Sequence, residues 1–256
     1  PLGTVGIISP WNFPVGLIFY PLASVFAAGN RAMVKPSEIT PATANIIKEG
    51  VQKYFDISEL AVITGDPAVG EKFSALKLDH LLFIGSNRVA KKVAAQAAKN
   101  LVPTTLELGG KSPTIIGHNA NLKLAAERIL FSKTLNAGQI CLSPDYIFVK
   151  KDDERNLISE LQKAYSKFFP KPNSNNQTSM VNKHHLERMN NYLLDATKKG
   201  ASIKSLGEYD DLDRNMISTK IVTKVTDDMN VMKDEIFGPI LPIMSYENIS
   251  DAVDYI

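Results

Sequence analysis

Short apolar stretches alternate with longer amphipathic ones along the chain, and this alternation predicts an α/β fold. The short runs are rich in Val, Ile and Leu, and Gly, Pro or polar residues close them. Strands are predicted at residues 4–10, 31–35, 60–63, 80–84, 104–108, 113–116, 146–149, 202–206, 217–225 and 240–245. Because helices separate most of these strands, the pattern favours mostly parallel sheets.

Several segments between these strands carry apolar residues at helical spacing. The run at 15–29 predicts a buried helix, because it contains Pro21 and is shorter than the roughly 20 residues that a membrane span needs. Thr40-Pro41 predicts the start of another helix, with Pro at the first helical position. Its predicted apolar face consists of Ile46, Ile47, Val51, Tyr54 and Phe55. Further helices are predicted from about residue 87 and at 122–135, 155–168 and 183–199.

Two glycines after the strand at 104–108 favour a tight turn, and we place a domain boundary there. The prediction is an α/β domain at 1–108 followed by a second α/β domain at 109–256. A polar loop is expected at 170–179. The chain starts at Pro1 without a signal peptide and stops in a helix-like stretch, so we expect a fragment of a longer protein, truncated at both ends.

Composition and charge exclude some classes of protein. The chain has 256 residues, of which 44% are hydrophobic and 22% charged, as in an average soluble globular protein. The net charge of +2 and the absence of Lys/Arg runs give no support for a nucleic-acid partner. No membrane segment is expected, and a single cysteine suits a reducing, cytoplasmic location.

That cysteine, Cys141, is the first candidate for chemistry. A lone cysteine is either a small buried apolar residue or a reactive thiol. Asn136 and Gly138 are poor helix formers, so the helix over 122–135 should end just before the cysteine. A thiol near the end of an element can face a cleft, but the local sequence leaves both interpretations open.

Two pairs of residues at strand ends suggest a nucleotide site. Gly85-Ser86 links a predicted strand to a helix N-terminus, where free N–H groups favour phosphate. The alternative is an ordinary turn. Lys35 and Glu38 follow another strand and could hold the hydroxyls of a ribose. The alternative there is solvated surface charge.

Other polar residues allow more than one role. Glu107 ends a strand beside two glycines and could act as a general base or as a salt-bridged boundary residue. Asn12 could donate to an oxyanion or simply occupy a turn. The imidazoles lack metal-ligand spacing with Cys141, so we expect no metal site and interpret them as structural or surface residues: His80, His118, His184 and His185.

Six segments together carry more information than any one of them. They are Pro10-Trp11-Asn12-Phe13-Pro14, Lys35-Pro36-Ser37-Glu38, Phe83-Ile84-Gly85-Ser86, Glu107-Leu108-Gly109-Gly110-Lys111-Ser112-Pro113, Gly138-Gln139-Ile140-Cys141 and Glu235-Ile236-Phe237-Gly238-Pro239. Their order and spacing resemble the NAD(P)-dependent aldehyde dehydrogenase superfamily over the whole chain. The fuller strings at 6–12, 79–83 and 141–146 are similar to its coniferyl aldehyde dehydrogenase branch.

The resemblance implies a Rossmann-like NAD-binding domain followed by a catalytic domain. It also implies NAD-dependent oxidation of an aldehyde to the acid through a cysteine thiohemiacetal and a thioester. Cys141 would be the nucleophile, Asn12 an oxyanion donor and Glu107 the base for water. The implied cofactor-binding residues are Trp11, Lys35, Glu38, Gly85, Ser86, Leu108, Glu235 and Phe237. Lys111 is interpreted as structural.

The resemblance also implies a cofactor preference, a substrate and an assembly, and it leaves two alternative functions open. Glu38 would repel a ribose 2′-phosphate, which favours NAD while leaving NADP possible. The implied substrate is a small-molecule aldehyde, and the implied assembly is a homodimer or homotetramer of the full-length protein. Ile84 departs from the Thr that the family usually has, which removes one hydroxyl near the pyrophosphate. The loop at 172–179 is also poorer in Gly and Pro than usual. Two rivals remain, a cysteine hydrolase and a non-catalytic structural relative.

Overall fold

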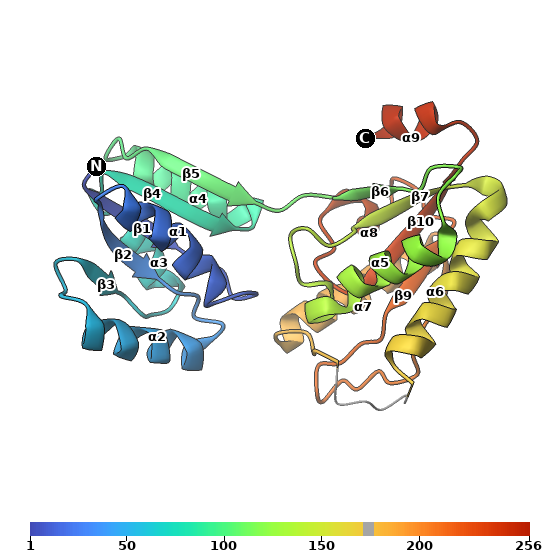
Figure 1. Ribbon diagram of the computed structural model, residues 1–256, viewed down its shortest axis with the longest axis horizontal. Helices are drawn as coiled ribbons and strands as arrows, with labels where there is room; N and C mark the ends of the chain where they lie inside the picture. The colour runs from blue at the N-terminus through green and yellow to red at the C-terminus, as the bar shows by residue number, and fades with distance from the viewer. Residues whose placement is uncertain (171–176) are drawn as a thin grey trace. The chain divides into compact units, whose positions relative to one another are not determined.

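The computed structural model describes residues 1–170 and 177–256 and divides into two compact units, Pro1–Gly109 and Gly110–Ile256 (Figure 1). Residues 171–176 of the predicted polar loop lie outside the described residues. None of the helices in the described ranges combines the length and apolar character needed to cross a bilayer.

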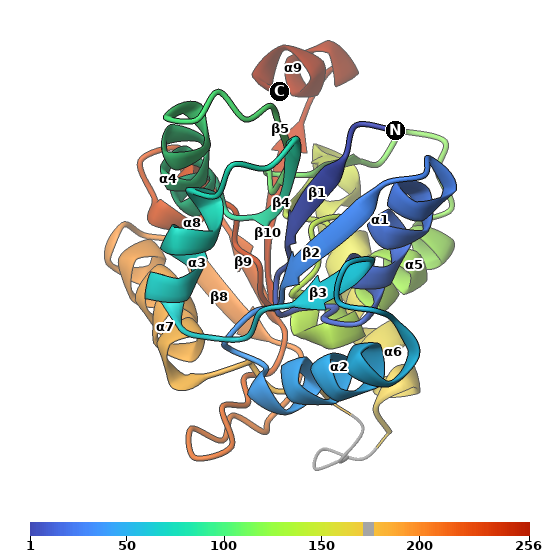
Figure 2. The same cartoon turned by 90° about the vertical axis from the view of Figure 1, so that its left-hand side faces the viewer.

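The first unit is a five-stranded parallel sheet with helices on both faces (Figure 2). Its strands are β1 (Thr4–Ile8), β2 (Arg31–Lys35), β3 (Leu60–Val62), β4 (His80–Gly85) and β5 (Thr104–Leu108). Its helices are α1 (Gly16–Ala27), α2 (Pro41–Tyr54), α3 (Pro67–Ser74) and α4 (Asn87–Ala98). The strand order β3-β2-β1-β4-β5 reverses its direction between β1 and β4, which confirms the Rossmann-like sheet.

The core of the first unit lies on both faces of this sheet. Helices α1 and α2 pack over β1, β2 and β3 on one face, and α3 and α4 pack beside β4 on the other (Figure 2). Val5 and Ile7 of β1 are buried on the α1–α2 face. The last strand, β5, is an edge strand with exposed side chains at four of its five positions.

The burial predicted for two helices was wrong in part. Only Ile18 and Leu22 of α1 are buried, one turn apart, while Tyr20 is 76% exposed. The run is apolar all round, so its composition gave no sign of which side faces the sheet. In α2 the buried residues are Ala44, Ile47 and Val51, and the predicted members Ile46 and Tyr54 are largely exposed.

One helix of the first unit was missed. Helix α3 begins with Asp66, whose side chain accepts from the Val69 N–H, followed by Pro67 at the first helical position. These are helix-start signals. The sequence pattern did not predict this helix, because α3 spans only eight residues and shows no long apolar period.

The second unit contains another five-stranded sheet, in the order β6-β7-β10-β9-β8. Its strands are β6 (Pro113–Ile115), β7 (Tyr146–Lys150), β8 (Ser202–Ser205), β9 (Lys220–Thr223) and β10 (Ile240–Tyr246). Its α-helices are α5 (Leu122–Thr134), α6 (Glu154–Phe168), α7 (Lys183–Lys198), α8 (Asn230–Lys233) and α9 (Ile249–Tyr255). The pairs are parallel except for β8, which runs antiparallel to β9. β9 covers only residues 220–223 of the strand predicted at 217–225.

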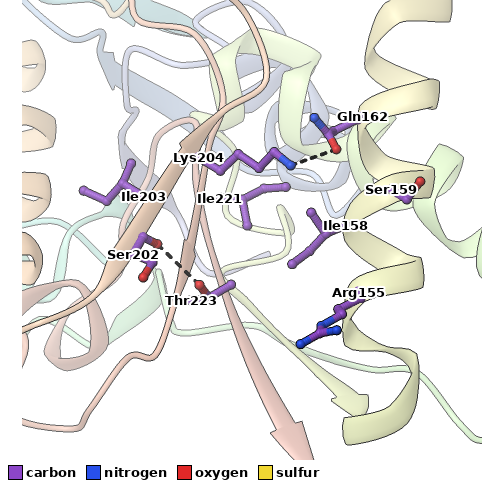
Figure 3. A pocket seen from close by; sticks show the side chains of 9 residues that line it. All are labelled: Arg155, Ile158, Ser159, Gln162, Ser202, Ile203, Lys204, Ile221 and Thr223. Atoms are coloured by element: carbon purple, nitrogen blue, oxygen red, sulfur yellow. Dashed lines mark hydrogen bonds between the residues drawn. The ribbon is translucent and has the colours of Figure 1, made fainter.

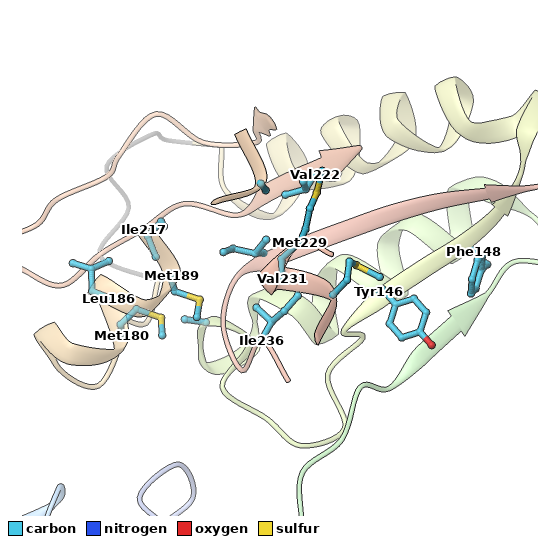
Figure 4. Close-up of a cluster of buried hydrophobic side chains, with 14 of the residues drawn as sticks. Tyr146, Phe148, Met180, Leu186, Met189, Ile217, Val222, Met229, Val231 and Ile236 are labelled. Atoms are coloured by element: carbon cyan, nitrogen blue, oxygen red, sulfur yellow. The ribbon is translucent and has the colours of Figure 1, made fainter. Parts of the chain in front are cut away.

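Alternation along β7 shows how this sheet is covered on both faces. Ile147 and Val149 join α5 and α6 in one buried cluster. Tyr146 and Phe148 face the other way, into a cluster with α7 that contains several methionines (Figure 4). Successive strand side chains point to opposite faces, so a strand buried on both sides reads as an unbroken apolar run.

Candidate active site

The carboxyl end of β2 carries a buried lysine. Ile8 pairs with Lys35 in the β1–β2 register, and the Ser9 N–H extends the ladder to the Lys35 carbonyl oxygen at 3.1 Å. Lys35 is 3% exposed and donates from Nζ to Glu38 Oε2 at 2.6 Å. A buried ammonium needs such a partner, because desolvation of an unpaired charge is costly. The pair therefore holds one carboxylate at the edge of the sheet.

The carboxyl end of β4 presents a helix N-terminus. Ser86 caps α4 and accepts from the Val89 N–H at 3.4 Å, and Ser86 is exposed. A Cβ on Gly85 would lie 2.7 Å from the Phe83 ring, so a side chain at this position would have to displace that ring. The N–H groups of the first turn and the helix dipole make this edge suitable for an anion.

The other residues predicted in the first unit share this edge. Gly85 pairs with Leu108, and Ile84 pairs with Glu107, in the β4–β5 register. Glu107 is exposed, while Trp11 and Asn12 are half-buried just after β1. Parallel strands end at a common edge, so the topology gathers the predicted residues of this unit at the carboxyl ends of its strands.

In the second unit, Cys141 lies on a loop with unusual backbone geometry. The loop follows α5 and places Asn136, Ala137 and Gly138 at φ values of 51°, 54° and 70°. Left-handed backbone at non-glycine residues persists only where the surroundings enforce it. Cys141 is exposed, which contradicts the alternative that it is a small buried apolar residue.

The side chain of Gln139 holds this loop in place through hydrogen bonds. Its side chain is 1% exposed. Its Oε1 accepts from the Val181 N–H at 2.9 Å, and its Nε2 donates to the carbonyl oxygens of Asn136 at 2.9 Å and Ser179 at 3.2 Å. A buried amide with its hydrogen bonds made rigidifies its surroundings. The Cys141 thiol is therefore carried by a rigid loop.

A buried lysine links the segments before and after the loop that carries Cys141. Lys133 of α5 is 1% exposed and donates to the Pro144 carbonyl oxygen at 2.8 Å. Burial lowers the pKa of Lys133 to about 8, although the nearby carboxylate of Asp145 acts in the opposite direction. Ser112 adds a longer contact to the carbonyl oxygen of Cys141 at 3.4 Å.

A second fixed segment is the turn at 235–239, which precedes β10. Asp145 is 3% exposed and accepts from the Ile236 N–H at 2.8 Å. Lys111 forms an ion pair with Asp145 and donates to the carbonyl oxygens of Val231 at 3.0 Å and Asp234 at 3.2 Å. Lys111 thus has the structural contacts that we expected, and Asp145 ties the turn to the start of β7.

Burial and the neighbouring carboxylate of Asp145 raise the pKa of Glu235 to about 7. The Gly110 N–H and the cations Arg188 and Lys133 act in the opposite direction. Glu235 therefore titrates close to neutral pH, and such perturbed groups are frequent in functional sites. Phe237, two residues on, has φ of 47°.

Sequence reasoning missed four residues that shape this unit: Lys133, Gln139, Asp145 and Arg188. Gln139 stands in the motif at 138–141, but no structural role was predicted for it. Asp145 and Arg188 both bind the backbone of Ile236, which lies 91 residues from Asp145 and 48 residues from Arg188 in sequence. No local pattern therefore points to them. An aspartate directly before an apolar strand was the one available signal.

Two further observations concern other possible sites. No group of three or more His, Cys, Asp or Glu side chains suited to a metal ion occurs among residues 1–170 and 177–256. A groove of about 370 Å³ lies between α6 and the strands β8 and β9, and Arg155 and Lys204 are among the residues that line it (Figure 3). Neither Cys141 nor Glu235 lines this groove.

Comparison with curated proteins gives close matches over the whole chain. A probable coniferyl aldehyde dehydrogenase of Caulobacter vibrioides is 48% identical over 261 residues, covering 100% of this chain and 54% of that protein. A coniferyl aldehyde dehydrogenase of a Pseudomonas species is 45% identical over 261 residues, with the same coverage. The chain thus spans about half the length of these relatives.

Solved structures agree with these matches. The substrate-bound AldH of Staphylococcus aureus has a TM-score of 0.94 and 41% identity, covering 100% of this chain and 56% of that one. A betaine aldehyde dehydrogenase of Staphylococcus aureus in complex with NAD+ has a TM-score of 0.89 and 28% identity, covering 99% and 52%. The profile of the aldehyde dehydrogenase family matches residues 1–256. This chain belongs to the aldehyde dehydrogenase family.

Proposed function

We propose that the protein carrying this chain oxidises an aldehyde to the carboxylic acid with NAD and uses Cys141 as its nucleophile. The observation that carries the proposal is the exposed Cys141 on a loop held by the buried Gln139. A nucleophile must meet its substrate in a defined position, and a fixed loop provides one. Family membership and the intact set of Asn12, Glu107 and Cys141 support the same reaction.

The chain's own residues take the following roles. The Cys141 thiolate attacks the carbonyl carbon, and the Cys141 N–H and the Asn12 amide donate to the resulting oxyanion. Loss of one such donor typically costs about 2.7–4 kcal/mol of barrier. Bound NAD would supply the acceptor for the hydride of the former aldehyde carbon, and a thioester would remain on Cys141. Glu107 then takes a proton from water as its oxygen adds to the thioester, and the acid and free Cys141 are released.

The residues of the first unit fit a dinucleotide. We assign residues 1–108 to NAD binding and 109–256 to the catalytic domain. The switch point between β1 and β4 is where doubly wound folds bind nucleotides. The Lys35–Glu38 pair offers a carboxylate for the adenosine ribose hydroxyls, and the capped N-terminus at Ser86 suits the pyrophosphate. Gly85, Leu108 and Trp11 line the same cofactor.

Glu38 also bears on the choice between the two nicotinamide cofactors. Its carboxylate accepts from Lys35 Nζ at 2.6 Å and would repel the 2′-phosphate of NADP, so NAD is preferred over NADP. In the second unit, Glu235 is assigned to the nicotinamide ribose and Phe237 to the nicotinamide ring. A carboxylate beside a ribose can accept from its hydroxyls, and an aromatic ring can pack against the nicotinamide.

The substrate and the setting are also proposals. Relatives named as coniferyl aldehyde dehydrogenases favour an aromatic, coniferyl-like aldehyde. Glu107 favours hydrolysis of the thioester over its transfer to coenzyme A. We further propose a cytoplasmic homodimer or homotetramer, as the family resemblance implies.

The test is NADH formation by the whole protein with coniferyl aldehyde and with an aliphatic aldehyde. We expect NADH with both cofactor and aldehyde present, and none from the Cys141→Ala variant. Folded protein that binds NAD but forms no NADH with either aldehyde would contradict the reaction. Loss of NAD binding as well would favour a structural relative. Cys141-dependent ester hydrolysis that also needs one histidine would instead favour a cysteine hydrolase.

A further inference from the structure

We propose that Arg188 is a positioning residue, which holds the turn at 235–239 so that Glu235 and Phe237 meet the cofactor in the productive geometry. The inference rests on the proposed function, because it gives these two side chains their roles. Arg188 lies on α7, in the second unit, and is half-buried.

The guanidinium reaches the backbone of three consecutive residues of this turn. Arg188 Nη1 donates to the Ile236 carbonyl oxygen at 2.6 Å, and longer contacts of 3.4 Å join Nη1 to the Glu235 carbonyl and Nη2 to the Phe237 carbonyl. The short bond is the strong one, and the longer contacts fix the orientation of the planar group. A single fork of donors therefore spans the segment that carries both cofactor-facing side chains.

Other contacts hold the turn from different directions. Asp145 accepts from the Ile236 N–H at 2.8 Å, so Ile236 is held at both its N–H and its carbonyl oxygen. Met189, the residue after Arg188, packs against Gly238, where an added Cβ would clash with the Met189 sulfur. Helix α7 thus presents two consecutive residues to one turn.

The turn needs this support because of its own backbone. Phe237 has φ of 47°, a left-handed conformation that costs a non-glycine residue free energy unless its surroundings enforce it. The Arg188 guanidinium also lies 5.5 Å from the centroid of the Tyr192 ring and 3.4 Å from His185 Nδ1, which limits its own movement. Loss of the guanidinium should let the turn relax and shift both side chains.

The test compares Arg188→Met and Arg188→Lys in the whole protein, with Arg155→Met as the matched control. Arg155 is exposed on α6, where it lines the groove of Figure 3 instead of the turn. Lysine keeps the charge and can reach one carbonyl, but it lacks the fork. Three quantities are measured: the Kd for NAD, the deuterium isotope effect on kcat with a 1-deuterated aldehyde, and Cys141-dependent hydrolysis of 4-nitrophenyl acetate, which needs no hydride transfer.

We expect Arg188→Met to lower the rate of hydride transfer by about tenfold to a hundredfold, the effect of misplacing reacting groups by about an ångström. The Kd for NAD should rise, the isotope effect should increase, and ester hydrolysis should be retained. Arg188→Lys should fall between Arg188→Met and wild type, and Arg155→Met should match wild type.

Two results would overturn the inference. If ester hydrolysis and hydride transfer fell in parallel in both variants, or if both failed to fold, Arg188 would serve stability alone. If hydride transfer and the Kd for NAD were unchanged in Arg188→Met, the turn would not depend on Arg188. Failure of the proposed function is distinct, because wild-type protein would then form no NADH.

Discussion

Gly138 lies against the carbonyl oxygen of Gly238, so closely that a Cβ at Gly138 would be 2.6 Å from that oxygen. The contact joins the loop that carries Cys141 to the turn that carries Glu235 and Phe237. The two segments are about 100 residues apart in sequence and are held together by backbone packing. Their relative position is therefore sensitive to a single added methyl group.

Gly138→Ala should disturb both segments. The substitution adds the clash with Gly238 to a backbone with φ of 70°, and we expect a loss of about 1–3 kcal/mol in the free energy of unfolding. The rate at which iodoacetamide alkylates Cys141 should also differ between Gly138→Ala and the wild-type protein. Gly117→Ala is the control, because no atom lies within 4 Å of a Cβ there. Equal stability of the two variants would contradict this prediction.

Asp145→Asn should be strongly destabilising. The Lys111–Asp145 pair is largely buried, with side-chain exposures of 19% and 4%. Removal of one charge leaves the other without its ionic partner, and we expect a loss of about 3 kcal/mol in denaturant unfolding. Glu247→Gln breaks an exposed pair with Lys151 and should cost less than about 1 kcal/mol. Similar losses in the two variants would show that burial of the first pair has no effect.

Lys133 should make stability rise with pH above about 8. Its pKa falls from 10.5 in the unfolded chain to about 8 in the folded protein, because it is buried. Between these values the unfolded chain binds the extra proton, so raising the pH favours the folded state by up to about 3 kcal/mol. Lys133→Met should lack this rise, and Lys123→Met, exposed on the same helix, should keep it. The free energy of unfolding of each protein is measured at about pH 7.5 and about pH 9.5, on either side of the folded-state pKa. If this free energy changed equally between the two pH values in wild type and in Lys133→Met, the prediction would be contradicted.

Glu38→Gln should weaken discrimination against NADP. The Glu38 carboxylate, held by Lys35 at 2.6 Å, would repel a 2′-phosphate, whereas the amide would not. We expect the ratio of kcat/KM for NADP to that for NAD to rise by about tenfold, the equivalent of about 1.4 kcal/mol. Glu49→Gln, an exposed change on α2, is the control. A wild-type preference for NADP would contradict the role given to Glu38.

Local sequence predicted the strands better than the helix faces. β1 and β4 are short apolar runs closed by Pro10 and Gly85, and each signal is complete within a few residues. The face of α2 was misassigned because Ile46 and Ile47 are equally apolar, and only the position of the sheet decides which is buried. Tertiary packing of this kind has no local signature.

The candidate site divides in the same way. Cys141 and Glu235 stand in short motifs, so the sequence could indicate them. Asp145 and Arg188 act through backbone groups 91 and 48 residues away, and such contacts become visible only when the chain is folded. The residues that position a site are therefore harder to predict than those expected to perform its chemistry.

Trapping the thioester on Cys141 tests the central proposal most directly. The variant is Glu107→Gln, in which the amide cannot take a proton from water. Mixing it with NAD and coniferyl aldehyde should give a burst of one NADH per site, and mass spectrometry of the Cys141 peptide should show the added acyl group. A burst without acylation of Cys141, or steady turnover at the wild-type rate, would contradict the proposed mechanism.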